Sequence, residues 1–258
     1  MAVDDVGAPD GVPVLYLHGT PDSRLARHPD DSLAAAAGVR LLAVDRPGYA
    51  GSSLAPLGPS HQGVVMAWSG GALDGLALAS ALGDRVTALH LVAGIVPASA
   101  FDDPLVRAAA PGRVGLLDMA SDLSPTELAP MLAPYPCDHA LALAHQEEAR
   151  SAPEQARLAA VPGAVDRMAD ALVEAVRDGL AGVERDLALQ TQPFEVDLAS
   201  MRAPVHLWYG ELDPVAPPAF GRWYADHLPK AQLHVVPDAG HFLPFTHWPE
   251  LLAAALAE

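Results

Sequence analysis

Three side chains that together could activate a serine stand far apart in this chain of 258 residues. Ser69 follows the apolar run VVMAW and precedes two glycines, Asp213 lies in GELDP, and His241 lies in DAGHF. A serine hydroxyl is a weak nucleophile at neutral pH. It needs a histidine as general base and a carboxylate that orients this base. The three residue types therefore predict attack by Ser69 on an acyl carbon, with His241 as base and Asp213 as its partner.

The residues around Ser69 have the sizes that a sharp strand-to-helix turn requires. Such a turn holds its serine in a strained backbone conformation, so the residues two before and two after it must be small. Ala67 and Gly71 meet this need, and Leu73 to Leu82 follow as a helical stretch. The motif is short enough to arise by chance. An ordinary turn in which Ser69 caps the helix is therefore the alternative.

Two further carboxylates compete for the role of Asp213. Asp238 lies three residues before His241 on the same loop, where it is more natural as a turn former. Glu211 and Asp213 both follow a strand, and of these two we favour Asp213. The chain order serine, aspartate, histidine is the one associated with one known fold of serine hydrolases.

Attack on a carbonyl carbon creates a negative oxygen, which backbone N–H groups can stabilise. The N–H of Gly70, directly after the nucleophile, is one candidate donor for this oxyanion hole. The N–H of Thr20, in the turn HGTP after the first candidate strand, is the other. Gly19 allows this turn to bend tightly, and we expect His18 to brace it by hydrogen bonds.

Short aliphatic runs that alternate with Ala- and Leu-rich stretches must position these residues. The alternation is typical of a parallel sheet covered by helices. Turns rich in Gly, Pro and Asp follow several runs, and ligand sites form at such carboxyl ends of parallel strands. The predicted strands are Pro13 to Leu17, Arg40 to Val44, Gly63 to Ala67, Thr87 to Val92, Val205 to Tyr209 and Gln232 to Val236.

A long stretch without a convincing strand separates the fourth candidate strand from the fifth. Helical periodicity is clear in His139 to Arg150 and in Ala164 to Val176. We predict a core made of residues 1–96 and 186–258, with residues 97–185 inserted as a helical cap. Prolines should cut this cap into short helices, because each removes a backbone donor and clashes with the preceding turn. They are Pro125, Pro130, Pro134, Pro136, Pro153 and Pro162.

Composition excludes several classes of protein. Apolar residues make up 51% of the chain and charged residues 18%, which indicates a packed globular domain. The formal charge is -17, so nucleic acid is not an expected partner. We find no membrane-length apolar run and no secretory signal at the start of the chain, and we expect a cytoplasmic protein.

Five motifs in order give the chain a resemblance to a known superfamily. LYLHGTPDSR, LLAVDRPGYAGSS, VVMAWSGG, LWYGELDPVAPP and DAGHF resemble the α/β-hydrolase superfamily, in its capped serine hydrolase branch. The resemblance implies the α/β-hydrolase fold and cleavage of an ester, thioester or similar acyl bond through an acyl-serine intermediate. It also implies no cofactor and no metal. An epoxide hydrolase or haloalkane dehalogenase of this fold would need an aspartate in place of Ser69.

The sequence departs from the superfamily's pattern in three places. Ala67 stands where glycine is common. Only about a dozen residues precede the first predicted strand, so the usual antiparallel strand pair is apparently missing. Ser52 to Gln62 shows no apolar periodicity, so a crossover helix is apparently missing as well. We therefore expect about six strands with one thinly covered face. A second copy of the chain could shield that face and the edge strand Arg40 to Val44, which suggests a homodimer.

Three classes of function remain open. The leading one is an esterase-like acyl hydrolase acting on a small hydrophobic ester. The second is a biosynthetic enzyme that uses the scaffold for acyl transfer, cyclisation or carbon–carbon cleavage, and the third is a non-catalytic small-molecule binding protein. Specificity should depend on cap residues whose positions the sequence does not determine. Apolar candidates for a pocket lining are Trp68, Phe101, Leu116, Met119, Met131, Tyr135 and Phe242.

Overall fold

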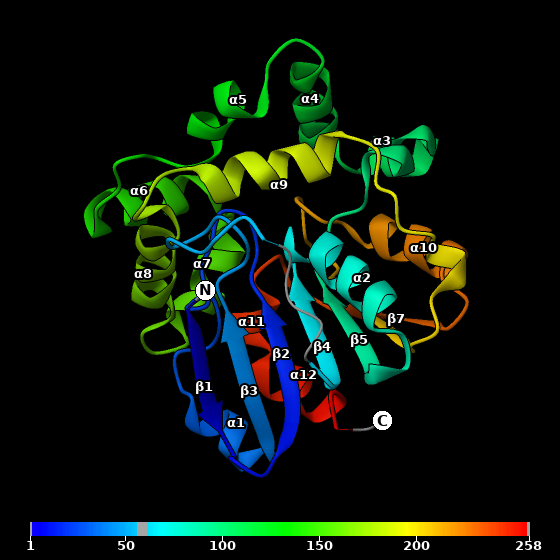
Figure 1. The fold of residues 1–258 in the computed structure, drawn as a ribbon. Helices are drawn as coiled ribbons and strands as arrows, with labels where there is room; N and C mark the ends of the chain where they lie inside the picture. Colours follow the sequence, from blue (N-terminus) through cyan, green and yellow to red (C-terminus); the bar gives the residue numbers. More distant parts are fainter. Residues whose placement is uncertain (1, 56–60, 257–258) are drawn as a thin grey trace.

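A mostly parallel sheet of seven strands forms the centre of the protein. The computed structural model describes residues 2–55 and 61–256, and Figure 1 shows its ribbon. The strand order is β1-β3-β2-β4-β5-β6-β7, and β1 alone runs antiparallel to its neighbour, β3. The strands are β1 (Val3–Gly7), β2 (Val12–Leu17), β3 (Val39–Val44), β4 (Gly63–Trp68), β5 (Val86–Val92), β6 (Val205–Gly210) and β7 (Ala231–Val236).

All six predicted strands are confirmed to within a residue at each end, but the expected strand number was wrong. β1 provides a seventh strand, so one antiparallel N-terminal strand is present where we predicted none. Its sequence VDDVG has acidic residues in its middle and no apolar run, and it therefore gave no strand signal. Backbone pairing with β3 holds β1 in the sheet. Its polar side chains are compatible with this position, because an edge strand can expose them to water.

The added strand also removes one reason for expecting a homodimer. β3 is not an edge strand, because β1 pairs with it from Val3 opposite Val44 to Gly7 opposite Arg40. The exposed edge is β1 itself, and its Asp5 makes an ion pair with Arg40 at 2.5 Å on the sheet surface. Charged side chains at an edge discourage pairing with another strand. The homodimer stays a prediction that depends on the thinly covered face alone.

The connection from β3 to β4 contains no helix among its described residues, 45–55 and 61–62, as predicted. Residues 56–60, which belong to the same predicted gap, lie outside the described residues. Helix α1 (Ser32–Ala36) packs against β1 and β3 from one side. On the other side Leu42 is only half-buried and Arg40 is exposed, so this face is thinly covered.

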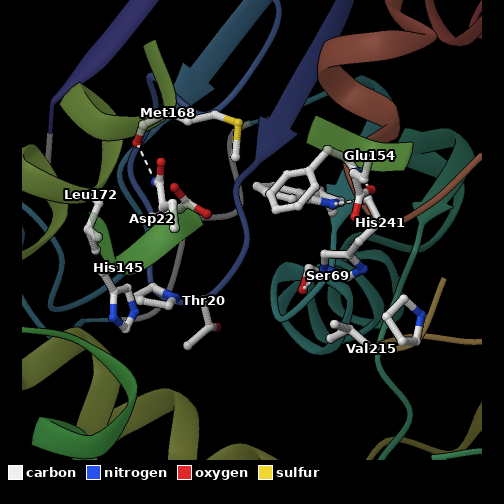
Figure 2. A pocket seen from close by; sticks show the side chains of 14 residues that line it. Thr20, Asp22, Ser69, His145, Glu154, Met168, Leu172, Val215 and His241 are labelled. Carbon is white, nitrogen blue, oxygen red and sulfur yellow. Dashed lines mark hydrogen bonds between the residues drawn. The ribbon is translucent and has the colours of Figure 1, made fainter. Parts of the chain in front are cut away.

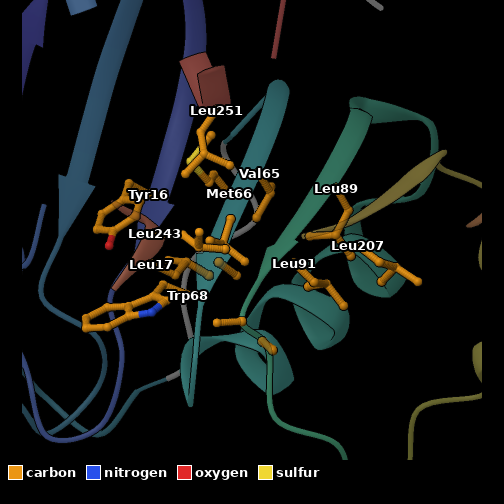
Figure 3. Close-up of a cluster of buried hydrophobic side chains, with 14 of the residues drawn as sticks. Tyr16, Leu17, Val65, Met66, Trp68, Leu89, Leu91, Leu207, Leu243 and Leu251 are labelled. Atoms are coloured by element: carbon orange, nitrogen blue, oxygen red, sulfur yellow. The ribbon is translucent and has the colours of Figure 1, made fainter. Parts of the chain in front are cut away.

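Helices cover the rest of the sheet on both faces. α2 (Gly71–Leu82) packs on β4 and β5, and α10 (Pro218–His227) packs on β6 and β7. α11 (Leu243–Thr246) and α12 (Trp248–Ala254) lie against the opposite face, where Leu243 and Leu251 approach Met66 (Figure 3). Every residue of β4 is buried. The strand that carries the nucleophile is therefore the most completely covered one in the sheet.

A second group of helices lies between β5 and β6 and gathers over one end of the sheet (Figure 1). These inserted helices are α3 (Pro104–Ala109), α4 (Pro111–Ala120), α5 (Pro125–Leu132), α6 (His139–Ala149), α7 (Ala152–Ala159), α8 (Ala164–Val176) and α9 (Ala181–Thr191). Short 3-10 turns occupy Gly83–Arg85, Ala98–Asp102 and Leu198–Ser200. The boundary between core and cap at residues 97 and 185 stays a prediction.

The inserted helices pack around a small apolar cluster of their own, which includes Leu128, Leu172 and Leu187, with Tyr49 joining from the core. The role predicted for Pro130 was wrong, because this residue lies inside α5 and does not end it. Ser124 begins α5 with a capping box, in which its side chain and that of Glu127 each bond the other residue's backbone N–H. Pro130 lacks an N–H, so the helix loses only the backbone bond from this position to the carbonyl of Thr126 and continues to Leu132.

Candidate active site

Ser69 lies at the turn between β4 and α2 in the left-handed backbone region, with φ +51°. A non-glycine residue in this region is strained by about 1–3 kcal/mol unless its surroundings hold it. Here the Ser69 N–H donates to the carbonyl of Val92 at 2.9 Å, and its own carbonyl accepts the N–H of Ile95 at 3.2 Å. Gly71 must be small, because a Cβ there would collide with the carbonyl of His18. The turn thus has the predicted geometry.

The side chain of Ser69 does not cap the helix, which was the alternative. Residue Gly70 occupies the N-cap position of α2, and no side-chain cap bond is formed there. The Ser69 hydroxyl instead lies 3.0 Å from Nε2 of His241. Nδ1 of the same ring lies 2.8 Å from Oδ2 of Asp213. The structure therefore brings the three predicted side chains together in the predicted order.

Asp213 is held so that one oxygen faces the histidine. Its Oδ1 accepts the N–H groups of Val215 at 2.8 Å and Ala216 at 2.9 Å, which leaves Oδ2 for His241. Glu211, the competing carboxylate, instead accepts the N–H of Asp238 at 3.4 Å. All three candidate triad residues are almost fully buried, with exposed fractions of 4–7%. A charge that forms among them is poorly screened by water.

Burial by itself disfavours the charged form of His241. The negative charge of Asp213 and its hydrogen bond outweigh burial, so the pKa of His241 is raised above its ordinary value. The bond from Nδ1 to Asp213 requires a proton on Nδ1 in the neutral ring. Nε2 is then unprotonated and faces Ser69, which is the tautomer a general base needs.

The two predicted oxyanion-hole residues lie against each other beside Ser69. A Cβ on Gly70 would collide with Oγ1 of Thr20, so glycine at this position allows the two turns to meet. Among the described residues, neither the Gly70 N–H nor the Thr20 N–H donates a hydrogen bond. Two free amides at the nucleophile are what stabilisation of a negative oxygen requires.

His18 braces the Thr20 turn, as expected. Its Nε2 accepts the N–H of Arg46 at 3.0 Å, and its Nδ1 donates to the carbonyl of Gly19 at 2.8 Å. Burial, assisted by the positive charge of Arg46, holds the pKa of His18 well below its ordinary value. The ring therefore stays neutral, and this fixed tautomer links the turn to the end of β3.

A buried ionic cluster, which the sequence analysis missed, connects this turn to the inserted helices. Arg46 binds Asp74 of α2 at 2.7 Å and Asp186 of α9 at 2.5 Å, and it also donates to the carbonyl of Gly19 at 2.8 Å. Asp186 in turn accepts the hydroxyl protons of Tyr49 and Thr20. A buried charge is costly unless it is paired in this way. Arg46 and Tyr49 belong to the motif DRPGYAGSS, whose polar residues were the available signal.

Two cavities meet at Ser69, Thr20, Pro21 and Val215. The first, here called the histidine-side cavity, encloses about 180 Å³ and is shown in Figure 2. The second, the arginine-side cavity, encloses about 290 Å³. The histidine-side cavity is further lined by Asp22, Trp68, His145, Gln146, Glu154, Met168, Leu172, Pro214, His241 and Phe242. The arginine-side cavity is further lined by Gly70, Ile95, Gly112, Arg113, Leu116, Met119, Leu132 and Gln190.

The polar lining of the histidine-side cavity was not predicted. Asp22, His145 and Leu172 lie across it from Ser69 and His241 (Figure 2). Burial raises the pKa of Asp22 to about 8, despite the positive charge of Arg46 nearby. Burial also raises the pKa of Glu154, although its carboxylate accepts the N–H of Phe242 at 3.1 Å. Asp22 stands in the motif HGTPDS, whereas nothing near His145 or Glu154 in the sequence marked them.

The seven apolar candidates for a pocket lining divide into three groups. Trp68 and Phe242 line the histidine-side cavity, and Leu116 and Met119 line the arginine-side cavity. Phe101 is part of the buried core. Met131 and Tyr135 are exposed by more than half of their surface and line neither cavity.

Comparison with solved structures identifies the fold. An α/β hydrolase fold protein from Nakamurella multipartita is similar over 99% of this chain and 94% of its own, with a TM-score of 0.65 and 25% identity. A thermophilic esterase from Thermogutta terrifontis is similar over 98% and 90%, with a TM-score of 0.60 and 22% identity. The chain therefore has the α/β-hydrolase fold, and the resemblance inferred from the five motifs is confirmed.

Sequence comparison gives a shorter match. Over 62 residues the chain is 37% identical to a pimeloyl-[acyl-carrier protein] methyl ester esterase from Nitrosomonas europaea. The match spans 24% of this chain and 24% of that relative. No family model matches the chain. Within the described residues, no helix is long and apolar enough to span a bilayer.

Proposed function

We propose that this protein is a serine hydrolase that cleaves an ester or related acyl bond through an acyl-serine intermediate. The observation that carries the proposal is the alignment of Ser69, His241 and Asp213, with hydrogen-bond distances of 3.0 and 2.8 Å. The likeness to a thermophilic esterase and to a methyl ester esterase supports a hydrolase acting on esters. Neither likeness specifies the substrate.

In the first half of the reaction, Oγ of Ser69 attacks the ester carbonyl carbon while Nε2 of His241 removes the hydroxyl proton. The carbonyl oxygen becomes negative and accepts hydrogen bonds from the amides of Gly70 and Thr20. The imidazolium is stabilised by Asp213, which keeps its charge. When the tetrahedral intermediate collapses, the bond to the alcohol oxygen breaks, and His241 gives its proton to that oxygen.

In the second half, water replaces the alcohol beside His241. Nε2 removes a proton from the water, its oxygen attacks the acyl carbon, and the same two amides hold the negative oxygen again. Collapse breaks the bond to Ser69 Oγ, which takes the proton back from His241. The acid is released and the protein returns to its starting state.

The cavities favour a small and largely apolar substrate. Trp68, Met168 and Leu172 line the histidine-side cavity, and Leu116 and Met119 line the other. We place the core–cap boundary at residues 97 and 185 and propose that the inserted helices act as a cap. Residues of α4, α6, α7, α8 and α9 complete the cavity walls over Ser69.

A fluorophosphonate probe tests the nucleophile. The probe should label Ser69, with its adduct located by mass spectrometry, because only an activated serine displaces fluoride at a useful rate. Ser69→Ala and His241→Ala should each abolish labelling, since one removes the attacking oxygen and the other removes the base.

The matched control is Ser99→Ala, which removes an exposed hydroxyl outside both cavities and should leave labelling unchanged. Circular dichroism establishes that each variant is folded. Folded wild-type protein that takes up no probe, and hydrolyses no p-nitrophenyl ester, would favour the binding-protein alternative.

A further inference from the structure

The arginine-side cavity is lined by a half-buried cation whose environment differs from that of the buried Arg46 and Arg27. Arg113, on α4, donates from Nη1 to Oε1 of Gln190 at 2.9 Å. Its Nε is buried and makes no hydrogen bond. Within the described part of the chain, no carboxylate lies within 4.0 Å of its guanidinium group, although the chain has 32 acidic residues. By contrast, Arg46 and Arg27 are each paired with aspartates.

An unpaired cation at a cavity wall is costly to the fold. An unsatisfied buried donor destabilises the folded state, and more so when it is charged. Burial lowers the pKa of Arg113 to about 10, so the group still carries its charge at pH 7. A charge kept at such a cost, and facing a cavity instead of solvent, is suited to a ligand that supplies the missing anion.

Gln190 fixes the position of Arg113 relative to the nucleophile. Its Nε2 donates to Oγ1 of Thr20 at 3.4 Å, while its Oε1 accepts from Arg113. The same Nε2 would lie 3.2 Å from a Cβ on Gly70. One side chain therefore separates the guanidinium from the candidate oxyanion hole. The lining of the same cavity also includes the apolar residues Ile95, Leu116 and Met119.

The chemistry of the triad decides which part of an ester enters which cavity. His241 must give its proton to the leaving alcohol, so the alcohol lies in the cavity that His241 lines. The acyl group is attached to the carbon that Ser69 attacks and extends away from His241. It therefore enters the arginine-side cavity, past Gly70.

We propose that the arginine-side cavity binds an acyl chain that ends in a carboxylate, and that Arg113 is the group that recognises this carboxylate. The substrate class is then the half-ester of a short dicarboxylic acid. The proposal rests on the serine hydrolase function proposed above. The planar fork of an arginine matches a carboxylate well, and Nη2 is the nitrogen of Arg113 that is neither enclosed like Nε nor bonded to Gln190.

Two p-nitrophenyl esters of equal chain length test the specificity. The mono-p-nitrophenyl ester of glutaric acid carries a terminal carboxylate, and p-nitrophenyl valerate has a methyl group at the same place. Wild-type protein should have a kcat/KM about 10- to 100-fold higher for the glutarate ester, as expected for one charge-assisted contact. Arg113→Met should lose this preference, because its kcat/KM should fall far more for the glutarate ester than for the valerate ester. Arg113→Lys keeps the charge without the fork and should retain part of the preference.

Arg107→Met is the matched control, because it removes an exposed arginine from the neighbouring helix α3 and should leave the preference intact. Equal kcat/KM for the two esters in the wild type would overturn the proposal. So would an equal loss on both esters in Arg113→Met, which would assign Arg113 a structural role.

Calorimetric titration with the free acids measures binding without catalysis, so it tests the anion site independently of the proposed hydrolase activity. Glutarate should bind the wild type at least about 10-fold more tightly than valerate, and Arg113→Met should bind both alike. If Ser69 is labelled by the fluorophosphonate but glutarate has no advantage, the anion site is wrong and the serine hydrolase stands. If glutarate is preferred but Ser69 is never labelled, the hydrolase is wrong and the anion site stands.

Discussion

The two cavities that meet at Ser69 differ in the charges of their walls. The histidine-side cavity has acidic groups, Asp22 and Glu154, whereas the arginine-side cavity has the cation Arg113. The nucleophile and the Thr20 turn form their common wall. One catalytic centre thus faces two electrostatic environments.

The difference suggests how a single site can orient an ester. An anionic end of a substrate is attracted by Arg113, which lines the arginine-side cavity, whereas no lysine or arginine among the described residues lines the histidine-side cavity. An uncharged alcohol group suits the histidine-side cavity, because Asp22, with its pKa raised to about 8, is mostly neutral at pH 7. Opposite walls therefore select the direction of binding as well as the substrate class.

The largest effect should come from the groups that both cavities share. Asp213→Asn removes the charge that holds His241 in its productive tautomer, and kcat should fall about 10⁴-fold on esters of either kind. The pKa of His241 is raised because of Asp213, and His241 must be neutral to act as base. The acidic limb of the pH profile of kcat/KM should therefore move to lower pH in the variant. An unchanged pH profile would show that Asp213 does not set the pKa of His241.

A smaller effect is expected from the wall next to the oxyanion hole. Gly70→Ala places a Cβ against Thr20 and should displace one of the two amide donors. Losing one such donor costs about 10²- to 10³-fold in kcat, and KM should change little. Gly115→Ala on α4 is the control, because a Cβ there meets nothing within 4 Å. Equal kcat values in the two variants would argue against Gly70 as a donor.

On the acidic side, Glu154 should act as a positioning residue. Its carboxylate holds the Phe242 N–H, next to His241. Glu154→Ala leaves that donor unpaired and loosens the loop, so kcat/KM should fall roughly 10-fold. Glu154→Gln keeps an acceptor oxygen and should restore most of the activity. If both variants lose activity equally, the charge matters and the hydrogen bond does not.

The smallest effect concerns stability. The pKa of Asp22 is about 8 in the folded protein, and the ordinary pKa of an aspartate, which applies to an unfolded chain, is 3.8. Between these pH values the folded state holds a proton that the unfolded state has released, so the free energy of unfolding falls as pH rises. Asp22→Asn has no such proton and should gain stability relative to wild type as pH rises from 4 to 8. Because water reaches the cavity, we expect a Tm difference of only about 2–4 °C at pH 8. Thermal melts at pH 4 and pH 8 measure it, and a constant difference contradicts the shifted pKa.

The sequence predictions succeeded where short-range patterns determine the structure, and failed where contacts between distant parts of the chain determine it. Val205 to Tyr209 was predictable because its valine, tryptophan and tyrosine favour a strand, and Gly210 ends it. Val3–Gly7 was missed because this strand contains no apolar run. It is held in the sheet by its pairing with β3, which is distant in the sequence. The candidate triad was predictable because its chemistry allows few residue types, each at the end of a strand.

Arg113, Glu154 and His145 were beyond reach for a different reason. Each belongs to an inserted helix, and its distance from Ser69 depends on how the inserted helices pack. Arg113 on α4 lines a cavity, and Arg107 on α3 is exposed to solvent. Nothing in the sequence around either arginine indicates this difference. Side-chain placement across a helical insertion is a property of tertiary packing that local patterns do not encode.

The buried cluster around Arg46 limits how this protein can be rebuilt. Its counter-charges come from two places in the chain, Asp74 next to the nucleophile turn and Asp186 far along in α9. A chimera that exchanges the inserted helices for those of another α/β hydrolase would leave the buried guanidinium of Arg46 with Asp74 alone as its counter-charge, unless Asp186 is transferred with them. Grafting should therefore begin with a donor that offers an acid at that position, and only then consider what its pocket accepts.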